Sequence, residues 1–269
     1  MTFEGIIQAI GKKPYYSDSS VVIYHADNRD ILPLIPDKSV DLVLTDPPYP
    51  NQSGGLSYEP NDPTARSRTV GDIWSADLSW ITEAWRISGK GMLIFSGILG
   101  IPLMAKSLPN DGYKGLVTWH KTNAPNSVRN VPKYDCEYVW LYQKSPGLNW
   151  RRVSCLLDVP TLVAGYHSKE RIVDITGLAV HPCQKPNEVI ISLLAVGGDS
   201  ILDPFLGSGT TAYCAKKLGR KCIGIEIEEK YCEIAAKRCS QSVLNLEIPP
   251  VKVEQQEGFV YDDGLPPNP

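Results

Sequence analysis

No stretch of the sequence is apolar over the roughly 20 residues that a membrane-spanning helix needs. The opening residues, MTFEGIIQAIGKKPYY, lack the pattern of a secretory signal peptide. The seven cysteines are odd in number, and their spacing is not that of a disulfide scaffold. These absences exclude the membrane-spanning and the small disulfide-rich classes, and we expect a protein of the reducing cytoplasm.

Metal-binding patterns are absent from the sequence as well. The histidines show no ligand spacing such as H-x-x-x-H. They are His25, His120, His167 and His181. No C-x-x-C pair occurs, and Cys232 and Cys239 share one predicted helical face with Ala235 and Ala236, which is typical of a core. We therefore expect no metal site.

Charge is distributed unevenly along the chain. The formal net charge of −3 does not by itself indicate a nucleic-acid partner. Residues 111–175 hold nine Lys and Arg against six Asp and Glu, whereas the tail from Leu244 onward holds one Lys against five acidic residues. A mildly basic middle is compatible with a DNA-binding face, and ordinary surface scatter explains it equally well.

Apolar periodicity predicts alternating strands and helices. The near-continuous apolar run at 40–46 is typical of a strand in a parallel sheet that is covered on both faces. The predicted strands are 21–26, 40–46, 91–97, 115–121, 136–144, 200–205 and 221–227, of which 115–121 and 136–144 form a candidate antiparallel pair. The predicted helices are 72–88, 98–108, 186–197, 210–219 and 228–239. Residues 51–71 are predicted to form a long loop.

A nucleotide-type βαβ unit is predicted in the last third of the chain. A strand ending in Asp203 is followed by the turn LGSG, a helix, and a second strand that ends near Glu226. Gly207 and Gly209 would let the backbone approach a ligand, and an acid about 20 residues on is suited to bind ribose hydroxyls. The lysine of a triphosphate-binding loop is missing, and the third glycine of the dehydrogenase fingerprint is missing too. The unit therefore predicts a ribose-bearing cofactor.

The strand at 40–46 ends in the motif DPPY, residues 46–49. Asp46 could simply cap the strand, and Tyr49 could be a packed turn aromatic. Alternatively, ligands of doubly wound sheets bind at the carboxyl ends of strands, where this motif and the glycine turn can be neighbours. One motif would then hold a cofactor and the other the reacting group.

Three motifs in this order resemble the β-class amino-methyltransferases of DNA: DPPY at 46–49, HPCQKP at 181–186 and DPFLGSGTT at 203–211. HADNRDIL (25–32), WHKTNAP (119–125) and CEYVWLYQKS (136–145) extend the resemblance to most of residues 21–240. The resemblance implies a Rossmann-like, doubly wound sheet of seven mostly parallel strands in the circularly permuted methyltransferase order. It also implies methyl transfer from S-adenosylmethionine to an exocyclic amine, adenine N6 or cytosine N4.

The resemblance assigns roles to individual residues. Asp46 and the carbonyl of Pro47 would accept the two amine hydrogens, Pro48 completes the motif, and Tyr49 would stack on a flipped base. Glu226 would hold the ribose hydroxyls and Asp27 the adenine, although Ala26 stands where the family usually has Gly. The full cofactor set is Asp27, Asp46, Lys185, Asp203, Pro204, Phe205, Gly207, Ser208, Gly209, Thr210, Thr211 and Glu226.

Double-stranded DNA is the partner that the resemblance implies. The basic candidates for phosphate contacts are Arg66, Arg68, Lys121, Arg129, Lys133, Arg151, Arg152, Lys169 and Arg171, and solvated surface charge explains each of them equally well. We expect one methyltransferase domain at 1–243, with a target-recognition insertion at about 122–180, and a poorly ordered tail at 244–269. No sequence feature fixes a homodimer or a companion restriction nuclease, which the resemblance allows.

Asp rather than Ser before PPY favours adenine N6, because cytosine-N4 members of this family often carry SPPY. Cytosine N4 stays the alternative substrate. A rival from another class is a DNA- or nucleoside-binding protein that kept the fold without the chemistry. The complete set of acceptors at 46–49 speaks against that rival.

Overall fold

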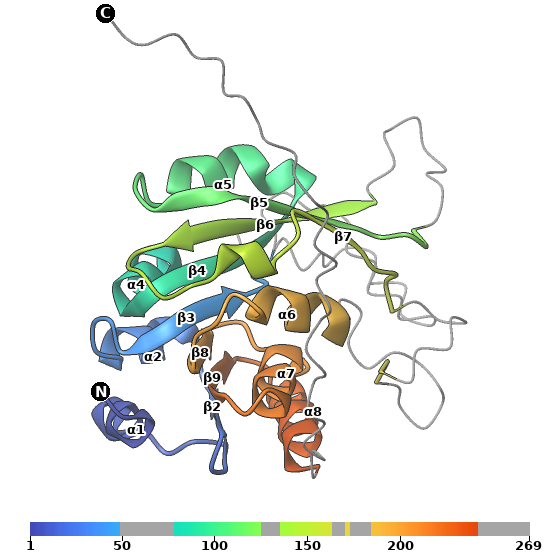
Figure 1. Ribbon diagram of the computed structural model, residues 1–269. Coiled ribbons are helices and arrows are strands. Elements are labelled where there is room, and N and C mark those ends of the chain that lie inside the picture. Colours follow the sequence, from blue (N-terminus) through green and yellow to red (C-terminus); the bar gives the residue numbers. More distant parts are fainter. Residues whose placement is uncertain (49–77, 125–134, 163–169, 173–183, 242–269) are drawn as a thin grey trace, which may run out of the picture.

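The protein is described from a computed structural model that covers residues 1–48, 78–124, 135–162, 170–172 and 184–241. Within these residues nine strands form one sheet in the order β1-β2-β9-β8-β3-β4-β6-β5-β7 (Figure 1). The strands are β1 (Tyr16–Ser17), β2 (Val21–His25), β3 (Val40–Thr45), β4 (Ser88–Gly97), β5 (Tyr113–His120), β6 (Cys136–Gln143), β7 (Leu156–Asp158), β8 (Ser200–Asp203) and β9 (Lys221–Glu226).

Most neighbouring strands run parallel. Parallel pairing runs without a break from β2 through β9, β8 and β3 to β4, and also joins β5 to β7. β1 pairs antiparallel with β2, and β6 pairs antiparallel with both β4 and β5. The predicted doubly wound, mostly parallel fold and the predicted antiparallel pair are therefore confirmed. Two short strands that were not predicted, β1 and β7, extend the sheet at its edges.

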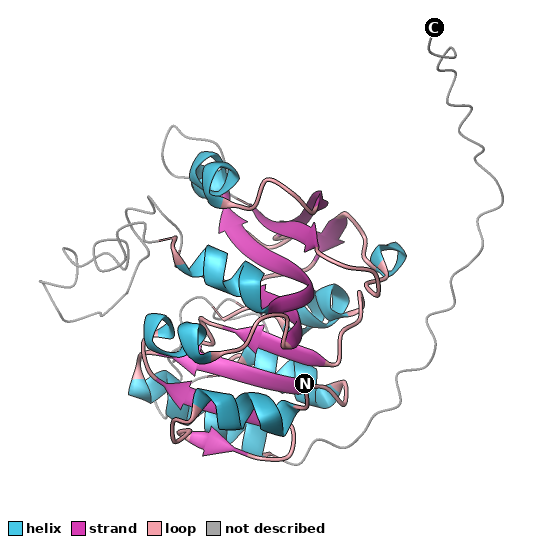
Figure 2. Cartoon of the chain, turned by 90° about the vertical axis from the view of Figure 1, so that its left-hand side faces the viewer, coloured by secondary structure: helices cyan, strands magenta, loops and turns pink. Residues whose placement is uncertain are grey.

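Helices cover both faces of the sheet (Figures 1 and 2). One layer holds α1 (Phe3–Ile10), α2 (Asn28–Ile31), α4 (Trp80–Ile87) and α5 (Ile101–Ser107). The other holds α6 (Asn187–Leu194), α7 (Thr210–Lys217) and α8 (Glu229–Ser240). Three short 3-10 helices are η1 (Leu32–Leu34), η2 (Ile98–Gly100) and η3 (Trp150–Arg152).

Two hydrophobic cores result from the alternation of side chains along the strands. In β3, Leu42 and Leu44 pack with α6, α7 and α8, whereas Val43 packs with the opposite layer. All three side chains are completely buried. A central strand whose two faces are both covered needs the continuous apolar run that the sequence shows.

A topological switch point lies between β8 and β3. From β8 the chain continues through α7 to β9 on one side, and α4 leads into β4 on the other side, with α7 and α4 on opposite faces of the sheet. Val43 of β3 is paired with Leu202 of β8, so the carboxyl ends of the two strands are adjacent. Such a point is where open α/β sheets bind their ligands.

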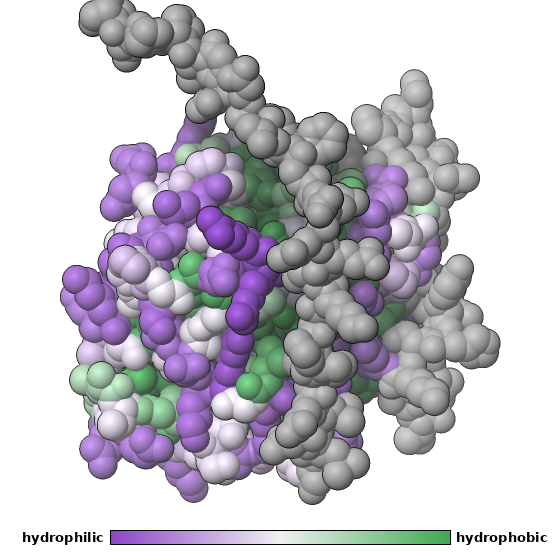
Figure 3. All heavy atoms as spheres, in the orientation of Figure 1, coloured by the Kyte–Doolittle hydropathy of each residue, from purple (hydrophilic) through white to green (hydrophobic). Residues whose placement is uncertain are grey.

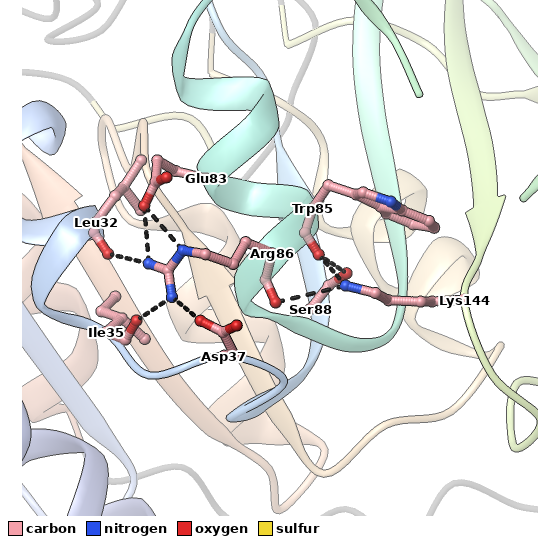
Figure 4. Close-up of polar contacts among 8 residues, drawn as sticks. All are labelled: Leu32, Ile35, Asp37, Glu83, Trp85, Arg86, Ser88 and Lys144. Carbon is pink, nitrogen blue, oxygen red and sulfur yellow. Dashed lines mark hydrogen bonds and ion pairs between the residues drawn. The ribbon is translucent and has the colours of Figure 1, made fainter. Parts of the chain in front are cut away.

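The carboxyl end of α4 is fixed by two basic side chains (Figure 4). Arg86 donates to the carbonyls of Leu32 and Ile35 at 3.0 and 2.8 Å, and it pairs with Asp37 and Glu83. Lys144 of the loop after β6 donates to the carbonyl of Trp85 at 2.7 Å. These contacts join α4 to the segment around η1 and to the loop that follows β6.

Hydrophilic side chains occupy much of the face seen in Figure 3, and hydrophobic ones appear between them. The large hydrophobic residues that are exposed belong to separate elements, for example Leu34 in η1, Ile98 in η2 and Leu156 in β7. Among the residues that the structure covers, no helix combines the length and the apolarity that crossing a membrane requires.

Candidate active site

The two acidic motif residues lie side by side at the switch point. Asp46 directly follows β3, and Asp203 ends the neighbouring strand β8. The hydroxyl of Thr45 donates to Asp203 Oδ1 at 2.7 Å, across 158 positions of sequence. The predicted meeting of the DPPY motif with the glycine-turn motif is therefore present in the fold.

Asp203 is buried beneath this edge, and its pKa is higher than that of an ordinary aspartate. Burial raises its pKa to about 6, and the nearby negative charge of Asp46 acts in the same direction. Hydrogen bonds from Thr211, Thr45 and the backbone N–H of Phe205 oppose the rise. Its carboxyl group therefore organises the start of the glycine turn from within.

The glycine turn and the tip of β9 form an acceptor site. Glu226 Oε2 accepts from the backbone N–H of Gly207 at 2.8 Å, and Oε1 accepts from that of Glu228 at 2.8 Å. Burial raises the pKa of Glu226, while these N–H donors stabilise its charged form. A carboxylate has about four acceptor positions, so Glu226 keeps capacity for ribose hydroxyls.

Three other residues of the turn face α8 instead. Gly209 has φ +81°, and a Cβ built there would lie 2.7 Å from the Cβ of Ala235. Thr210 Oγ1 accepts from buried Arg238 at 2.9 Å, and the carbonyl of Ser208 accepts from the same guanidinium at 3.5 Å. The missing side chain of Gly209 therefore makes room for α8, and the approach of its backbone to a ligand stays a prediction.

Further predicted cofactor residues, Asp27, Pro204 and Phe205, lie against α2 and α4. Asp27 caps α2 through the N–H of Arg29 at 2.9 Å, and hydrogen bonding by Arg29 lowers its pKa. Asn28 donates to the carbonyl of Pro204 at 3.4 Å. The ring of Phe205 meets that of Trp80 edge to face at 5.1 Å. A cavity of about 450 Å³ borders Asn28 and Trp80 beside these contacts.

Lys185 of the HPCQKP motif connects Asp46 to β6. Its ammonium donates to Asp46 Oδ2 and lies 3.2 Å from Glu137 Oε2. Glu137 Oε1 in turn lies 2.6 Å from the ammonium of Lys121. Sequence reasoning predicted a role for Lys185 near the cofactor and gave no role to Glu137. The only signal for Glu137 was its place as an acid in the apolar strand CEYVWLYQ.

The basic residues predicted to contact DNA do not all lie at one edge. Lys121 is at the carboxyl edge in its pair with Glu137, and Arg171 donates to the carbonyl of Leu162 at 2.5 Å. Arg151 and Arg152 lie in η3, where Trp150 donates to Gln143, the β6 residue paired with Gly91 at the start of β4. They are therefore at the edge opposite Asp46. Tyr49, Arg66, Arg68, Arg129, Lys133 and Lys169 lie outside the described residues.

Comparison with known proteins agrees with this geometry. The family model N6_N4_Mtase, described as DNA methylase, matches residues 40–237. The Type II methyltransferase M2.DpnII of Streptococcus pneumoniae is 32% identical over 251 residues, which cover 84% of this chain and 92% of that protein. The Type II methyltransferase M2.LlaDCHI of Lactococcus lactis subsp. cremoris is 30% identical over 260 residues, covering 85% and 93%.

Among solved structures, the complex of M1.HpyAVI with SAM aligns with a TM-score of 0.58 at 25% identity, covering 82% of this chain and 99% of that one. The matched segment spans both the DPPY motif and the glycine turn that the sheet brings together. The chain therefore belongs to the N6/N4 family of DNA methylases, whose members are S-adenosylmethionine-dependent DNA methyltransferases.

Proposed function

We propose that this DNA methyltransferase methylates N6 of an adenine that is flipped out of duplex DNA, with Asp46 as the acceptor that prepares the amine. The observation that carries the proposal is the position of Asp46 at the switch point, beside buried Asp203 and paired with Lys185.

The exocyclic amine is a poor nucleophile because its lone pair is delocalised into the aromatic ring. Two acceptors, one for each hydrogen, favour a pyramidal nitrogen whose lone pair is exposed. The Asp46 carboxylate and the carbonyl of Pro47 are suited to this task, since the proline ring fixes φ and so fixes the direction of the chain. Holding the amine in line with the methyl donor supplies much of the acceleration.

S-adenosylmethionine, when bound, supplies a methyl group on a positively charged sulfur. The residues that would hold it fit its parts. Glu226 keeps acceptor capacity for ribose hydroxyls, ionised Asp27 can accept from an adenine amino group, and Phe205 offers an aromatic ring beside Asn28. Thr211 supports the site indirectly through its hydrogen bond to Asp203.

Methyl transfer forms a nitrogen–carbon bond and breaks the carbon–sulfur bond, whose electron pair stays on sulfur. The nitrogen must then lose a proton. The Asp46 carboxylate, already in contact with one amine hydrogen, is placed to receive that proton before water removes it. Tyr49 would hold the flipped base by stacking, as single bases are held by aromatic side chains.

The role of Asp46 is tested by replacing it with alanine. Asp46→Ala should lower transfer of a labelled methyl group to DNA by about 100-fold or more, while S-adenosylmethionine still binds in a calorimetric titration. Asp37→Ala, which removes an exposed carboxylate on Arg86, should transfer methyl groups normally. Near-normal transfer by Asp46→Ala would refute the assignment.

The target base is tested separately. The protein is expressed in a host without DNA methylation, and the host DNA is then sequenced with modification-sensitive reads. We expect N6-methyladenine at one short sequence. Finding N4-methylcytosine instead would show that cytosine is the target base. An unmodified genome would favour the hypothesis of a DNA- or nucleoside-binding protein without catalytic activity.

We propose in addition that residues around 122–180 recognise the target sequence. The chain would act as a homodimer in the cytoplasm. A companion nuclease would cut the same DNA sequence. All six cysteines within the described residues are free thiols, which suits a reducing compartment. Digestion of methylated and unmethylated DNA with nucleases of known specificity would identify the sequence that such a partner shares.

A further inference from the structure

Four charged side chains form a row at the carboxyl edge of the sheet, in the order Lys121, Glu137, Lys185 and Asp46. The signs alternate, and Glu137 uses a different carboxylate oxygen for each lysine, at 2.6 and 3.2 Å. The row ends on Asp46, which Lys185 contacts at Oδ2. It links the ends of β5 and β3 to the start of β6 and to the segment before α6.

The row is largely shielded from water. The side chains of Lys185 and Glu137 are 9% and 12% exposed. The ammonium of Lys185 lies 5.2 Å from the ring centre of Phe95 and 5.9 Å from that of Trp119, both buried. Charge interactions are stronger in such surroundings than at a surface, so each group in the row depends on its neighbours.

We propose that Glu137 is a positioning residue for methyl transfer, which holds the ammonium of Lys185 in place and thereby sets the orientation and charge balance of Asp46. This inference rests on the proposed role of Asp46 as the acceptor of the target amine. Glu137 itself would touch neither the base nor the methyl donor, and it would act only through Lys185.

Glu137 would affect Asp46 because it changes the net charge of the row. With Glu137 ionised, two carboxylates balance two ammonium groups, and Lys185 divides its attraction between two anions. With Gln at 137, the row keeps one carboxylate and two ammonium groups, so Lys185 no longer shares its attraction between Asp46 and Glu137, and the row becomes more positive. Both changes make the Asp46 carboxylate a weaker acceptor for an amine hydrogen. A lysine that is held by one anion instead of two also has more freedom to move.

The test is a double-mutant cycle on kcat, measured as labelled methyl transfer at saturating DNA and S-adenosylmethionine. Glu137→Gln and Lys185→Gln should each lower kcat about tenfold or more, and the double variant should be no slower than Lys185→Gln within about threefold. KM for both substrates should stay within about twofold in Glu137→Gln, because the interaction serves the reacting group and not binding. Glu137→Asp, which keeps the charge, should retain more activity than Glu137→Gln.

Asp18→Asn is the control, because it removes one carboxylate from a partly buried pair, with Lys216 at 2.5 Å, next to the edge strand β1. It should lower the unfolding midpoint and leave kcat unchanged. The inference is overturned by a kcat of Glu137→Gln within about twofold of wild type, by losses that multiply in the double variant, or by Glu137→Asp being no better than Glu137→Gln. Should Lys185→Gln not fold, the two Glu137 variants still decide.

Asp46→Ala is assayed alongside, which separates the two hypotheses. If Asp46→Ala remains active, the proposed function of Asp46 fails. If Asp46→Ala is inactive and Glu137→Gln is normal, only the positioning role of Glu137 fails.

Discussion

At the scale of single residues, Asp203 is a carboxyl group that the fold buries. Its folded-state pKa of about 6 lies above the ordinary value of 3.8 because burial disfavours the carboxylate. The folded protein therefore binds this proton more tightly than the unfolded chain does. The stabilising contribution is complete below about pH 4 and is lost as the pH rises through 6.

This pH dependence predicts the behaviour of Asp203→Asn, which has no proton to lose. Between pH 4 and pH 7 the wild-type free energy of unfolding should fall by about 2 kcal/mol relative to that of the variant. Urea denaturation of both proteins at unit steps of pH measures the difference. A difference that stays constant with pH would show that Asp203 titrates alike in the folded and unfolded states.

Single residues also show that neighbours in a contiguous motif have different partners. The sequence-based hypothesis gave all residues from 203 to 211 except Leu206 to the cofactor, since the family motif is continuous. At the start of a helix, successive side chains point in directions about 100° apart, so neighbours in a motif face different partners. Thr211 reaches Asp203, whereas Thr210 reaches Arg238 of α8.

At the scale of elements, strands were easier to predict than their contacts. The seven predicted strands all occur, because long apolar runs mark strands that are covered on both faces. β1 and β7 have only two and three residues, too few for a period. α1 was missed although Thr2 and Gly11 cap it, because its eight residues were weighed only as a signal peptide.

The pairing of Glu137 with Lys185 could not be predicted from the sequence. The two residues come from separate motifs, and they meet only because β6 runs antiparallel to β4 and so begins at the carboxyl edge. Direction and order of strands decide which motif ends are neighbours. Periodicity predicts that a strand exists, but it does not predict the place of that strand in the sheet.

The anchoring of α4 leads to a prediction at the same scale. Arg86→Lys should lower the free energy of unfolding by about 1–3 kcal/mol, because an ammonium group cannot replace a planar guanidinium that serves two carbonyls and two carboxylates (Figure 4). Urea denaturation checks it. Glu83→Gln, which removes one half-exposed partner of Arg86, should cost less than about 1 kcal/mol. Equal losses in both variants would contradict the reasoning.

At the scale of the whole molecule, an acidic protein must bind DNA through local positive charge. Each phosphate contact changes the slope of log K against log salt by about 0.9. Arg151 and Arg152 lie at the edge away from Asp46, so replacing both with Gln should leave the slope unchanged for a duplex bound over Asp46. Binding titrations at several salt concentrations measure it. A slope lower by about 2 would show that DNA reaches this edge, as the sequence-based prediction requires.

The position of β8 between β9 and β3 also bears on when the enzyme becomes active during its synthesis. β3 and its Asp46 leave the ribosome early, but the neighbour that supplies Asp203 is made 158 positions after Thr45. Pairing over such a distance forms late and slowly. The nascent chain therefore carries an exposed, apolar strand edge and an unassembled candidate site until its last third emerges.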